Sequence, residues 1–215
     1  GSQVGYVCEG IFRSQEDIDN HATQNGAGLG RMMWKDLNGD GVITEADQDW
    51  IYSPVPAFTY GMNFYFEYKG LDLTLFFQGV QGVDVISDLK KETDLWAGLN
   101  ISNLNKGTRL LDAWSPTNPN SNIPALTLSD NNNEKRVSSY WVENGSYLKL
   151  KNIQLGYNLP ESALKKMHMQ RWRFFLSAQN VFTIKSKSFS GLDPENPNFG
   201  YPIPLNITLG TNVSF

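Results

Sequence analysis

Apolar and polar residues alternate over residues 58–83, and this stretch dominates the pattern of the chain. Before a Lys69-Gly70 pair, large apolar or aromatic side chains occupy the even positions, while small or polar ones occupy the odd positions. After the pair the alternation resumes. A two-residue turn that contains glycine between two alternating runs predicts a β-hairpin. The expected apolar face consists of Tyr60, Met62, Phe64, Phe66, Tyr68, Leu71, Leu73, Leu75 and Phe77.

Two architectures explain an apolar hairpin face of this kind. Tyr60 and Tyr68 lie at the two ends of the first strand. The eight residue-to-residue steps from Tyr60 to Tyr68, at about 3.3 Å each and tilted by about 40°, rise roughly 20 Å, which is close to the apolar band of an outer-membrane barrel. Aromatic residues at both rims of such a band suit the two lipid–water boundaries. A soluble β-sandwich that buries this face gives the same pattern, so the hairpin alone leaves both architectures open.

Alternating patterns predict five strands in all. They cover residues 58–69, 71–83, about 140–159, 171–184 and 204–215. Within the third strand the alternation slips at Lys151-Asn152, which predicts a β-bulge. Shorter elements are expected elsewhere. Residues 1–12 are expected to form a short strand or an ordered loop. Helices are expected over 14–24, with Ser14 as the N-cap, and over 160–168, with Pro160 at the first position.

The connections between the predicted strands alternate in length. Those at residue 70 and at residues 160–170 are short, while those at 84–139 and 185–203 are long. All short connections therefore lie at one end of the sheet, as in outer-membrane barrels, where the periplasmic turns are short and the outer loops are long. A sandwich does not require this alternation. The more than fifty residues without a clear strand in the first long connection also argue against a compact soluble domain.

The composition excludes several classes of protein. The chain has 215 residues, of which 19% are charged, and a net charge of -4. This balance gives no reason to expect a nucleic-acid-binding protein, which would need a basic face. A membrane helix is not expected because no run of 18 apolar residues is present, and the N-terminus at Gly1 does not resemble a signal peptide. The single cysteine, Cys8, excludes a disulfide framework and a cysteine metal cluster.

Residues 36–47, DLNGDGVITEAD, predict a calcium-binding loop. Oxygen ligands at alternate positions wrap one cation because a glycine at the sixth place, Gly41, turns the chain inward. Asp47 at the last place is shorter than the usual Glu, and no helix is expected before Asp36. The alternative is a run of Asx turns followed by a helix that Thr44 caps. The expected ligands of Ca²⁺ are Asp36, Asn38, Asp40, the carbonyl of Val42, and Asp47.

Other candidate residues point to binding rather than catalysis. Four aromatic residues lie in and just after the long connection at 84–139, and they are Trp96, Trp114, Tyr140 and Trp141. Their side chains could stack on sugar or peptide ligands, or they could pack the connection against itself. The two histidines, His21 and His168, lie in exposed-looking helical stretches without a nucleophile motif nearby, so the chain is not expected to be an enzyme. Acidic residues are expected to line a hydrated interior, and they are Glu67, Asp72 and Glu143.

A set of motifs stands in one order along the chain. They are GSQVGYVCEGIF with SQEDID, DLNGDGVITEAD, PAFTYGMNFYFEYKGLDLTLFFQGVQG, ENGSYLKLKNIQLGYNLP, FFLSAQNVF, SGLDPE and YPIPLNITLGTNVSF. Together they resemble the C-terminal part of the SusC/RagA family of TonB-linked outer-membrane transporters, over nearly the whole chain outside the loops. One departure is Leu205, which stands where the family usually has a basic residue after YPIP.

The resemblance implies a fold and a function. The expected fold is all-β, the last five or six strands of an antiparallel outer-membrane β-barrel with long extracellular loops and short periplasmic turns. Residues 1–57 would form an extracellular loop region with the calcium-like motif, and residues 58–215 would form transmembrane strands. The whole barrel would enclose a plug, take energy from the TonB complex and import glycans, oligosaccharides or peptides with a SusD-like surface lipoprotein, in the outer membrane of a Gram-negative bacterium. Phe215 would be the outward aromatic residue that the assembly machinery reads.

Five or six strands cannot close a barrel, because even the smallest outer-membrane barrels use about eight. We therefore expect an open sheet whose edges are covered by other segments of the same barrel, with lipid on its apolar face. The alternative is a secreted, calcium-stabilised β module that binds glycans.

Overall fold

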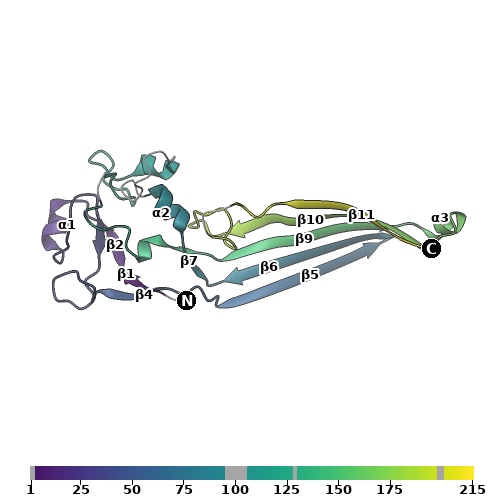
Figure 1. Ribbon diagram of the computed structural model, residues 1–215, viewed down its shortest axis with the longest axis horizontal. Coiled ribbons are helices and arrows are strands. Elements are labelled where there is room, and N and C mark those ends of the chain that lie inside the picture. Colours follow the sequence, from purple (N-terminus) through teal and green to yellow (C-terminus); the bar gives the residue numbers. More distant parts are fainter. Residues whose placement is uncertain (1–2, 95–105, 128–129, 198–200) are drawn as a thin grey trace.

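The computed structural model describes residues 3–94, 106–127, 130–197 and 201–215, and it is an elongated molecule made mainly of antiparallel strands (Figure 1). One long sheet forms most of its length, and shorter elements gather at one end of that sheet. None of the helices in these described ranges is both long and apolar enough to cross a bilayer.

The long sheet contains the five strands that the sequence predicts. They are β5 (Phe58–Tyr68), β6 (Leu71–Gln81), β9 (Tyr147–Asn158), β10 (Arg171–Lys185) and β11 (Asn206–Ser214). Their order is β11-β10-β9-β6-β5, and each pair of neighbours is antiparallel. The predicted all-β antiparallel fold is confirmed, and β5 and β11 are the two edges of an open sheet.

A two-residue turn joins β5 to β6, as predicted. Tyr68 pairs with Leu71, and the residues between them, Lys69 and Gly70, have φ angles of 48° and 84°. Positive φ at both central positions is the signature of the type I′ turn, whose twist matches that of the strands. The backbone N–H of Asn158 donates to the carbonyl of Gly70 at 2.8 Å, which fixes the turn against β9.

The predicted β-bulge lies in β9. Leu150 and Asn152 pair with consecutive residues of β6, Phe77 and Phe76, so Lys151 has no partner in that ladder. The pairing of β9 with β10 shifts at the same place. The bulge keeps the apolar residues on both sides of it on one face of the sheet.

Two small sheets precede the long one. β1 (Gln3–Tyr6) pairs with β4 (Gln48–Tyr52), and β2 (Cys8–Ile11) pairs with β3 (Met32–Trp34). The sequence pattern predicted one short strand or an ordered loop before residue 13, because strands of three to five residues are too short to establish a period of two.

Helix α1 (Gln15–Asn20) begins where the sequence predicts it but ends earlier. Ser14 is the N-cap and accepts a hydrogen bond from the N–H of Asp17, whose carboxylate accepts from the N–H of Ser14 in return. This reciprocal capping box satisfies two N–H groups that the helix leaves free.

The long connection after β6 has more structure than expected. It contains β7 (Asp84–Ile86), α2 (Asp88–Asp94) and the 3₁₀ turn η1 (Thr108–Asp112). A second 3₁₀ turn, η2 (Ser139–Trp141), leads into β8 (Val142–Asn144), which pairs with β7. The predicted strand over 140–159 is therefore two strands, and the predicted absence of a strand in 84–139 was wrong.

Helix α3 (Glu161–Lys166) fills the short connection between β9 and β10. Pro160 is its N-cap rather than its first helical residue. The helix therefore begins one residue later than the sequence analysis placed it.

Most buried apolar residues lie among the short elements and the connections rather than in the long sheet. Met32, Trp34 and Trp141 are fully buried against one another, with Tyr6 and Ile86 packed around them. By contrast, large apolar residues along β5 and β11 are exposed, with Leu209 at 80% and Phe66 at 55%. A soluble sandwich would place its core on the long sheet, so this distribution favours the barrel.

Candidate functional site

The outer face of the long sheet is continuously apolar. Two adjacent rows of directly paired residues cross all five strands without a polar side chain: Phe64, Leu75, Ile153, Ala178 and Ile207 in one, and Phe66, Leu73, Leu155, Leu176 and Leu209 in the other. An exposed apolar surface of this extent marks contact with a membrane or another protein. The face that the sequence predicted from β5 and β6 therefore extends across the whole sheet.

Thr211 is a polar residue of β11 on this face, and its hydrogen bonds are satisfied. The hydroxyl of Thr211 accepts from the indole N–H of Trp172 at 2.8 Å and donates to the backbone carbonyl of Arg173 at 3.1 Å. A hydroxyl with both roles satisfied loses little when water is absent. Thr211 is thus compatible with an apolar surrounding.

An ion pair crosses three strands on the inner face, near the end with the short turns. Asp72 of β6 accepts from Nε of Arg173 in β10 at 3.0 Å and from its Nη2 at 2.5 Å, and both side chains are almost buried. The pair lies over Gly156 of β9, where an added Cβ would stand 2.6 Å from Asp72 Oδ1. The glycine therefore provides the space through which β6 and β10 are linked. Sequence analysis expected Asp72 on a hydrated interior but did not identify its partner.

A second charged cluster lies on the inner face near the long connections. Lys149 of β9 is fully buried, and its Nζ is 2.7 Å from Asp193 Oδ2 and 2.7 Å from Glu195 Oε2. Lys151, the bulged residue, donates to both oxygens of Glu195 at 2.8 Å. A buried ammonium is stable only when it is paired in this way. The cluster holds the connection between β10 and β11 against the inner face.

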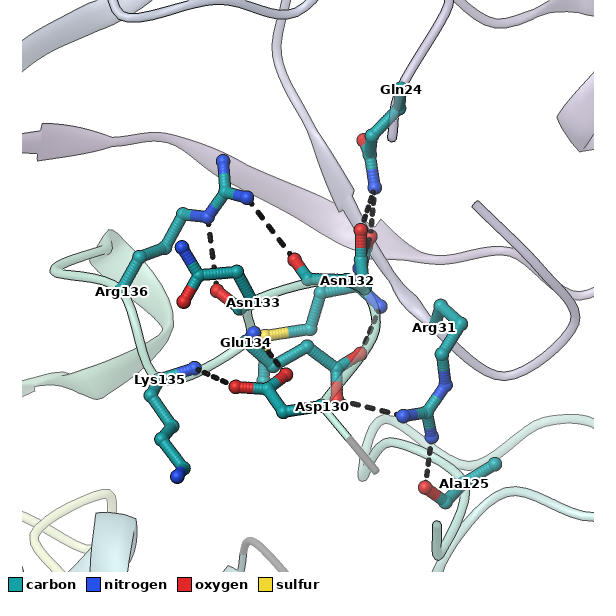
Figure 2. A network of polar contacts seen from close by, with 10 residues as sticks. Gln24, Arg31, Ala125, Asp130, Asn132, Asn133, Glu134, Lys135 and Arg136 are labelled. Carbon is teal, nitrogen blue, oxygen red and sulfur yellow. Dashed lines mark hydrogen bonds and ion pairs between the residues drawn. The ribbon is translucent and has the colours of Figure 1, made fainter. Parts of the chain in front are cut away.

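A buried polar network ties the early loops to the long connection (Figure 2). Arg31 Nη1 is 3.0 Å from Glu134 Oε2, and the other carboxylate oxygen accepts from the N–H of Met32 at 2.8 Å. Gln24 donates to Asn132 Oδ1 at 2.8 Å. Burial raises the pKa of Glu134, and the neighbouring guanidinium of Arg31 opposes that rise. These bonds join segments about a hundred residues apart, so no local signal in the sequence could reveal them.

In the calcium-like motif, carboxylates accept hydrogen bonds from the backbone. Asp36 accepts from the N–H groups of Gly39 at 2.7 Å and Gly41 at 2.8 Å, and Asp40 accepts from the N–H of Val42 at 2.9 Å. Among the described residues, no group of three or more His, Cys, Asp or Glu side chains is arranged to hold a metal ion. The contacts are those of the Asx-turn alternative, and calcium binding stays a prediction.

Asp47, the last expected ligand, is fully buried. Its carboxylate accepts from the N–H of Thr44 at 2.7 Å and from the N–H of Leu37 at 3.0 Å. The hydrogen bond from Thr44, the largest influence, lowers the pKa of Asp47. The helix that the Asx-turn alternative placed after Thr44 does not form, because Asp47 and Thr44 close a turn that leads into β4.

The aromatic candidates differ in their surroundings. Trp141 is fully buried in the core cluster, and Trp114 is nearly buried against Gly30, so both favour packing over ligand stacking. Tyr140 is half-buried, with the ammonium of Lys90 4.0 Å from its ring centroid. Trp96 lies outside the described residues. Phe215 is 80% exposed beyond the end of β11, and its role in assembly stays a prediction.

Taken together, these two faces define a class of protein. An open antiparallel sheet has an apolar outer face, an ion-paired inner face, and its short turns gathered at one end. That combination is the wall of an outer-membrane β-barrel.

The comparisons with known proteins narrow this class. The chain is 35% identical, over its whole length, to TonB-dependent receptor P3 of Formosa agariphila. This match covers 22% of the length of that receptor. It is 26% identical, over 99% of its length, to TonB-dependent receptor SusC of Bacteroides thetaiotaomicron, of which the match covers 20%. No family model matches.

The solved structures agree. The RagAB peptide transporter matches over the whole chain with a TM-score of 0.71 and 25% identity, and the match covers 22% of that chain. The RagAB peptide importer in its closed-closed state matches with a TM-score of 0.73 and 25% identity, over 23% of that chain. The chain belongs to the TonB-dependent receptors of the SusC and RagA type, and it spans about a fifth of the length of these relatives. Their names are those of receptors and importers, in agreement with the prediction that this chain is not part of an enzyme.

Proposed function

We propose that the chain forms the C-terminal part of the wall of a TonB-dependent importer in the outer membrane of a Gram-negative bacterium. The observation that carries this proposal is the continuous apolar face across all five strands of the long sheet. In lipid, such a face costs nothing to expose, whereas in water it would have to be buried. The similarity to a TonB-dependent receptor over the whole length of the chain supports the same function.

The orientation follows from the connections. The turn at Lys69-Gly70 and helix α3 lie at one end of the sheet, and we place this end in the periplasm. The opposite end carries the small sheets, the long connection after β6 and the connection between β10 and β11. We assign these parts to the extracellular side, with residues 1–57 as a loop region and residues 58–215 as the barrel segment.

The two edge strands of the sheet, β5 and β11, should pair with further strands of the same protein. Within the described residues, β5 and β11 each pair on one side only. In hydrocarbon each unpaired backbone group costs several kcal/mol, so both edges must be covered by other strands. The rest of the same barrel, closed around a plug, would supply them.

The imported substrate is a glycan, an oligosaccharide or a peptide, and the partners are a SusD-like surface lipoprotein and the TonB complex. Two solved relatives are described as a peptide transporter and a peptide importer. SusC is a TonB-dependent receptor of the same type. These relatives support the class of substrate without choosing between its members.

Uptake in the native bacterium tests this function. A strain that lacks the full-length receptor should lose uptake of one member of a panel of glycans and peptides, and the wild-type gene should restore it. Restoration should fail when TonB is deleted. Uptake that continues without TonB would contradict the proposal, and dispersal of the protein as a monomer in buffer without detergent would favour a secreted β module instead.

A further inference from the structure

A polar cavity lies where four separate segments meet at the end of the sheet with the long connections. It has a volume of about 470 Å³, which is within the range of small-molecule sites. Helix α2, the turn η1, strand β8 and the connection between β10 and β11 line it, and Figure 1 shows α2 beside that connection. The lining carries three cations and one carboxylate, Lys90, Arg109, Lys187 and Glu143.

The one carboxylate in the lining balances only one of the three positive charges, and it accepts its hydrogen bonds from the wall of the cavity. Glu143 is 5% exposed and accepts from both the N–H and the hydroxyl of Ser190, at 2.9 and 3.0 Å. The hydroxyl of Ser190 lies 2.9 Å from that of Ser87, at the start of α2. These bonds fix the connection between β10 and β11 to the wall of the cavity.

The cations retain unused donors. Lys90 donates to the carbonyl of Tyr140, and Arg109 pairs with Asp94 at 3.2 Å through one of its nitrogens. In the described parts of the chain Lys187 makes no hydrogen bond or ion pair. An ammonium has three donors and a guanidinium has five, so the contacts of these side chains within the described residues leave donors available to a ligand in the cavity that they line.

Burial disfavours the charge of Lys90. It lowers the pKa of Lys90, and the carboxylate of Glu143, the next largest influence, opposes this effect. An anion bound in the cavity would also favour the charged form of Lys90, and it would accept from the donors that lack a partner.

We propose that this cavity binds an oxyanion group, a carboxylate or a sulfate, and that Arg109 and Lys187 are its principal contacts. The serine-bearing connection that forms one wall is the same one that Lys149 holds on the inner face of the sheet. The site therefore lies on the side of the sheet that faces the barrel interior, near its mouth. That the oxyanion belongs to an imported substrate rests on the proposed function, while the binding of the ion itself does not.

The experiment uses the purified full-length receptor and inorganic oxyanions. Crystals soaked in selenate should show an anomalous peak within hydrogen-bond distance of Arg109 and Lys187. In solution, calorimetric titration with sulfate and with acetate, at constant ionic strength in chloride, should detect binding of at least one of the two. The double variant R109Q/K187Q should bind at least about tenfold more weakly, because two charge-assisted contacts are lost.

A matched control removes the same charge elsewhere. The double variant K165Q/K166Q in helix α3 carries two fewer positive charges at the opposite end of the sheet, where Lys165 is 80% exposed, and it should bind like the wild type. Binding of sulfate alone would assign the site to sulfate groups, and binding of both anions would extend it to carboxylates. No peak, a peak that persists in R109Q/K187Q, or a crystal peak without binding in solution (an adventitious ion only) would overturn the proposal. Because none of these measurements involves transport, they fail independently of the uptake assay.

Discussion

A charge placed on the outer face at Phe64 should destabilise the protein far more than the same charge one residue away. Phe64 lies four residues from each of Tyr60 and Tyr68, the aromatic ends of the apolar face of β5. At about 3.3 Å per residue and a tilt of about 40°, it lies roughly 10 Å from each rim, at the membrane midplane. Its ring meets that of Phe77 edge to face, with the centroids 5.9 Å apart.

The size of the effect follows from these two surroundings. Arginine on the lipid face at the midplane costs about 2–4 kcal/mol, and the lost aromatic pair adds about 0.5–1.5 kcal/mol. Phe64→Arg should therefore cost roughly 3–5 kcal/mol. Phe64→Ala measures the packing loss alone. Asn63→Arg places the same charge on the inner face and should cost less than about 1 kcal/mol.

Equilibrium unfolding of the full-length receptor in phospholipid vesicles measures these differences. The variants are compared by their denaturant midpoints at a common slope. Equal costs for Phe64→Arg and Asn63→Arg would refute the assignment of the two faces. A cost for Phe64→Arg no greater than that for Phe64→Ala would show that this position does not face hydrocarbon.

Three further outcomes are expected. Gly156→Ala should separate Asp72 from Arg173, because the new Cβ would stand 2.6 Å from the carboxylate. In the full-length receptor this substitution should cost about 1–3 kcal/mol of stability in the same unfolding assay. If Gly156→Ala costs as much in an Asp72→Ala background, the loss of the ion pair is not the cause. If the motif at residues 36–47 binds calcium, Asp40→Ala should lower the melting temperature in calcium buffer and leave it unchanged in chelator, whereas an equal loss in both buffers would favour the Asx turns. Burial raises the pKa of the Cys8 thiol to about 11, so its alkylation in the folded protein should be slow at pH 7 and should accelerate about tenfold per pH unit up to that value; a rate at pH 7 equal to that of the unfolded chain would contradict the burial of the thiol.

The long strands were predictable because they repeat one local rule many times. Each of β5, β6, β9, β10 and β11 has at least nine residues, long enough for the period of two to appear. The turn at Lys69-Gly70 and the bulge at Lys151 were also visible, since both interrupt that period at a single place. Glycine in a two-residue turn has a direct stereochemical reason, because both central residues need positive φ.

The short elements and the charged clusters were not predictable from local pattern. β4 and β7 contain too few residues to show a period, and they form because neighbouring strands offer them hydrogen bonds. The Asp72–Arg173 pair joins residues 101 positions apart, and only the register of β6, β9 and β10 brings them together. Gly156 was a weak signal, since a glycine within a strand often marks a close approach.

The candidate site was predicted in part. The residues of the calcium-like motif and the aromatic side chains could be singled out from the sequence, but the sequence left Trp141 open between ligand contact and packing, and in the structure it packs against Met32 and Trp34. The cavity with Arg109 and Lys187 could not be identified, because four separate segments of the chain supply its walls. Charged residues in loops carry no local mark that separates a site from a solvated surface.

The lipid exposure of β5 is the most direct test of the account. Single cysteines replace each of residues 58–68 in the full-length receptor, in a background where Cys8 is alanine, and each carries a spin label in vesicles. Accessibility to oxygen, which concentrates in hydrocarbon, and to a water-soluble nickel complex is then measured at every position. The account predicts alternation with a period of two, with the even positions from Tyr60 to Tyr68 accessible to oxygen and protected from nickel. An absence of alternation, or greater nickel accessibility at the even positions, would contradict the claim that this sheet is the wall of an outer-membrane barrel.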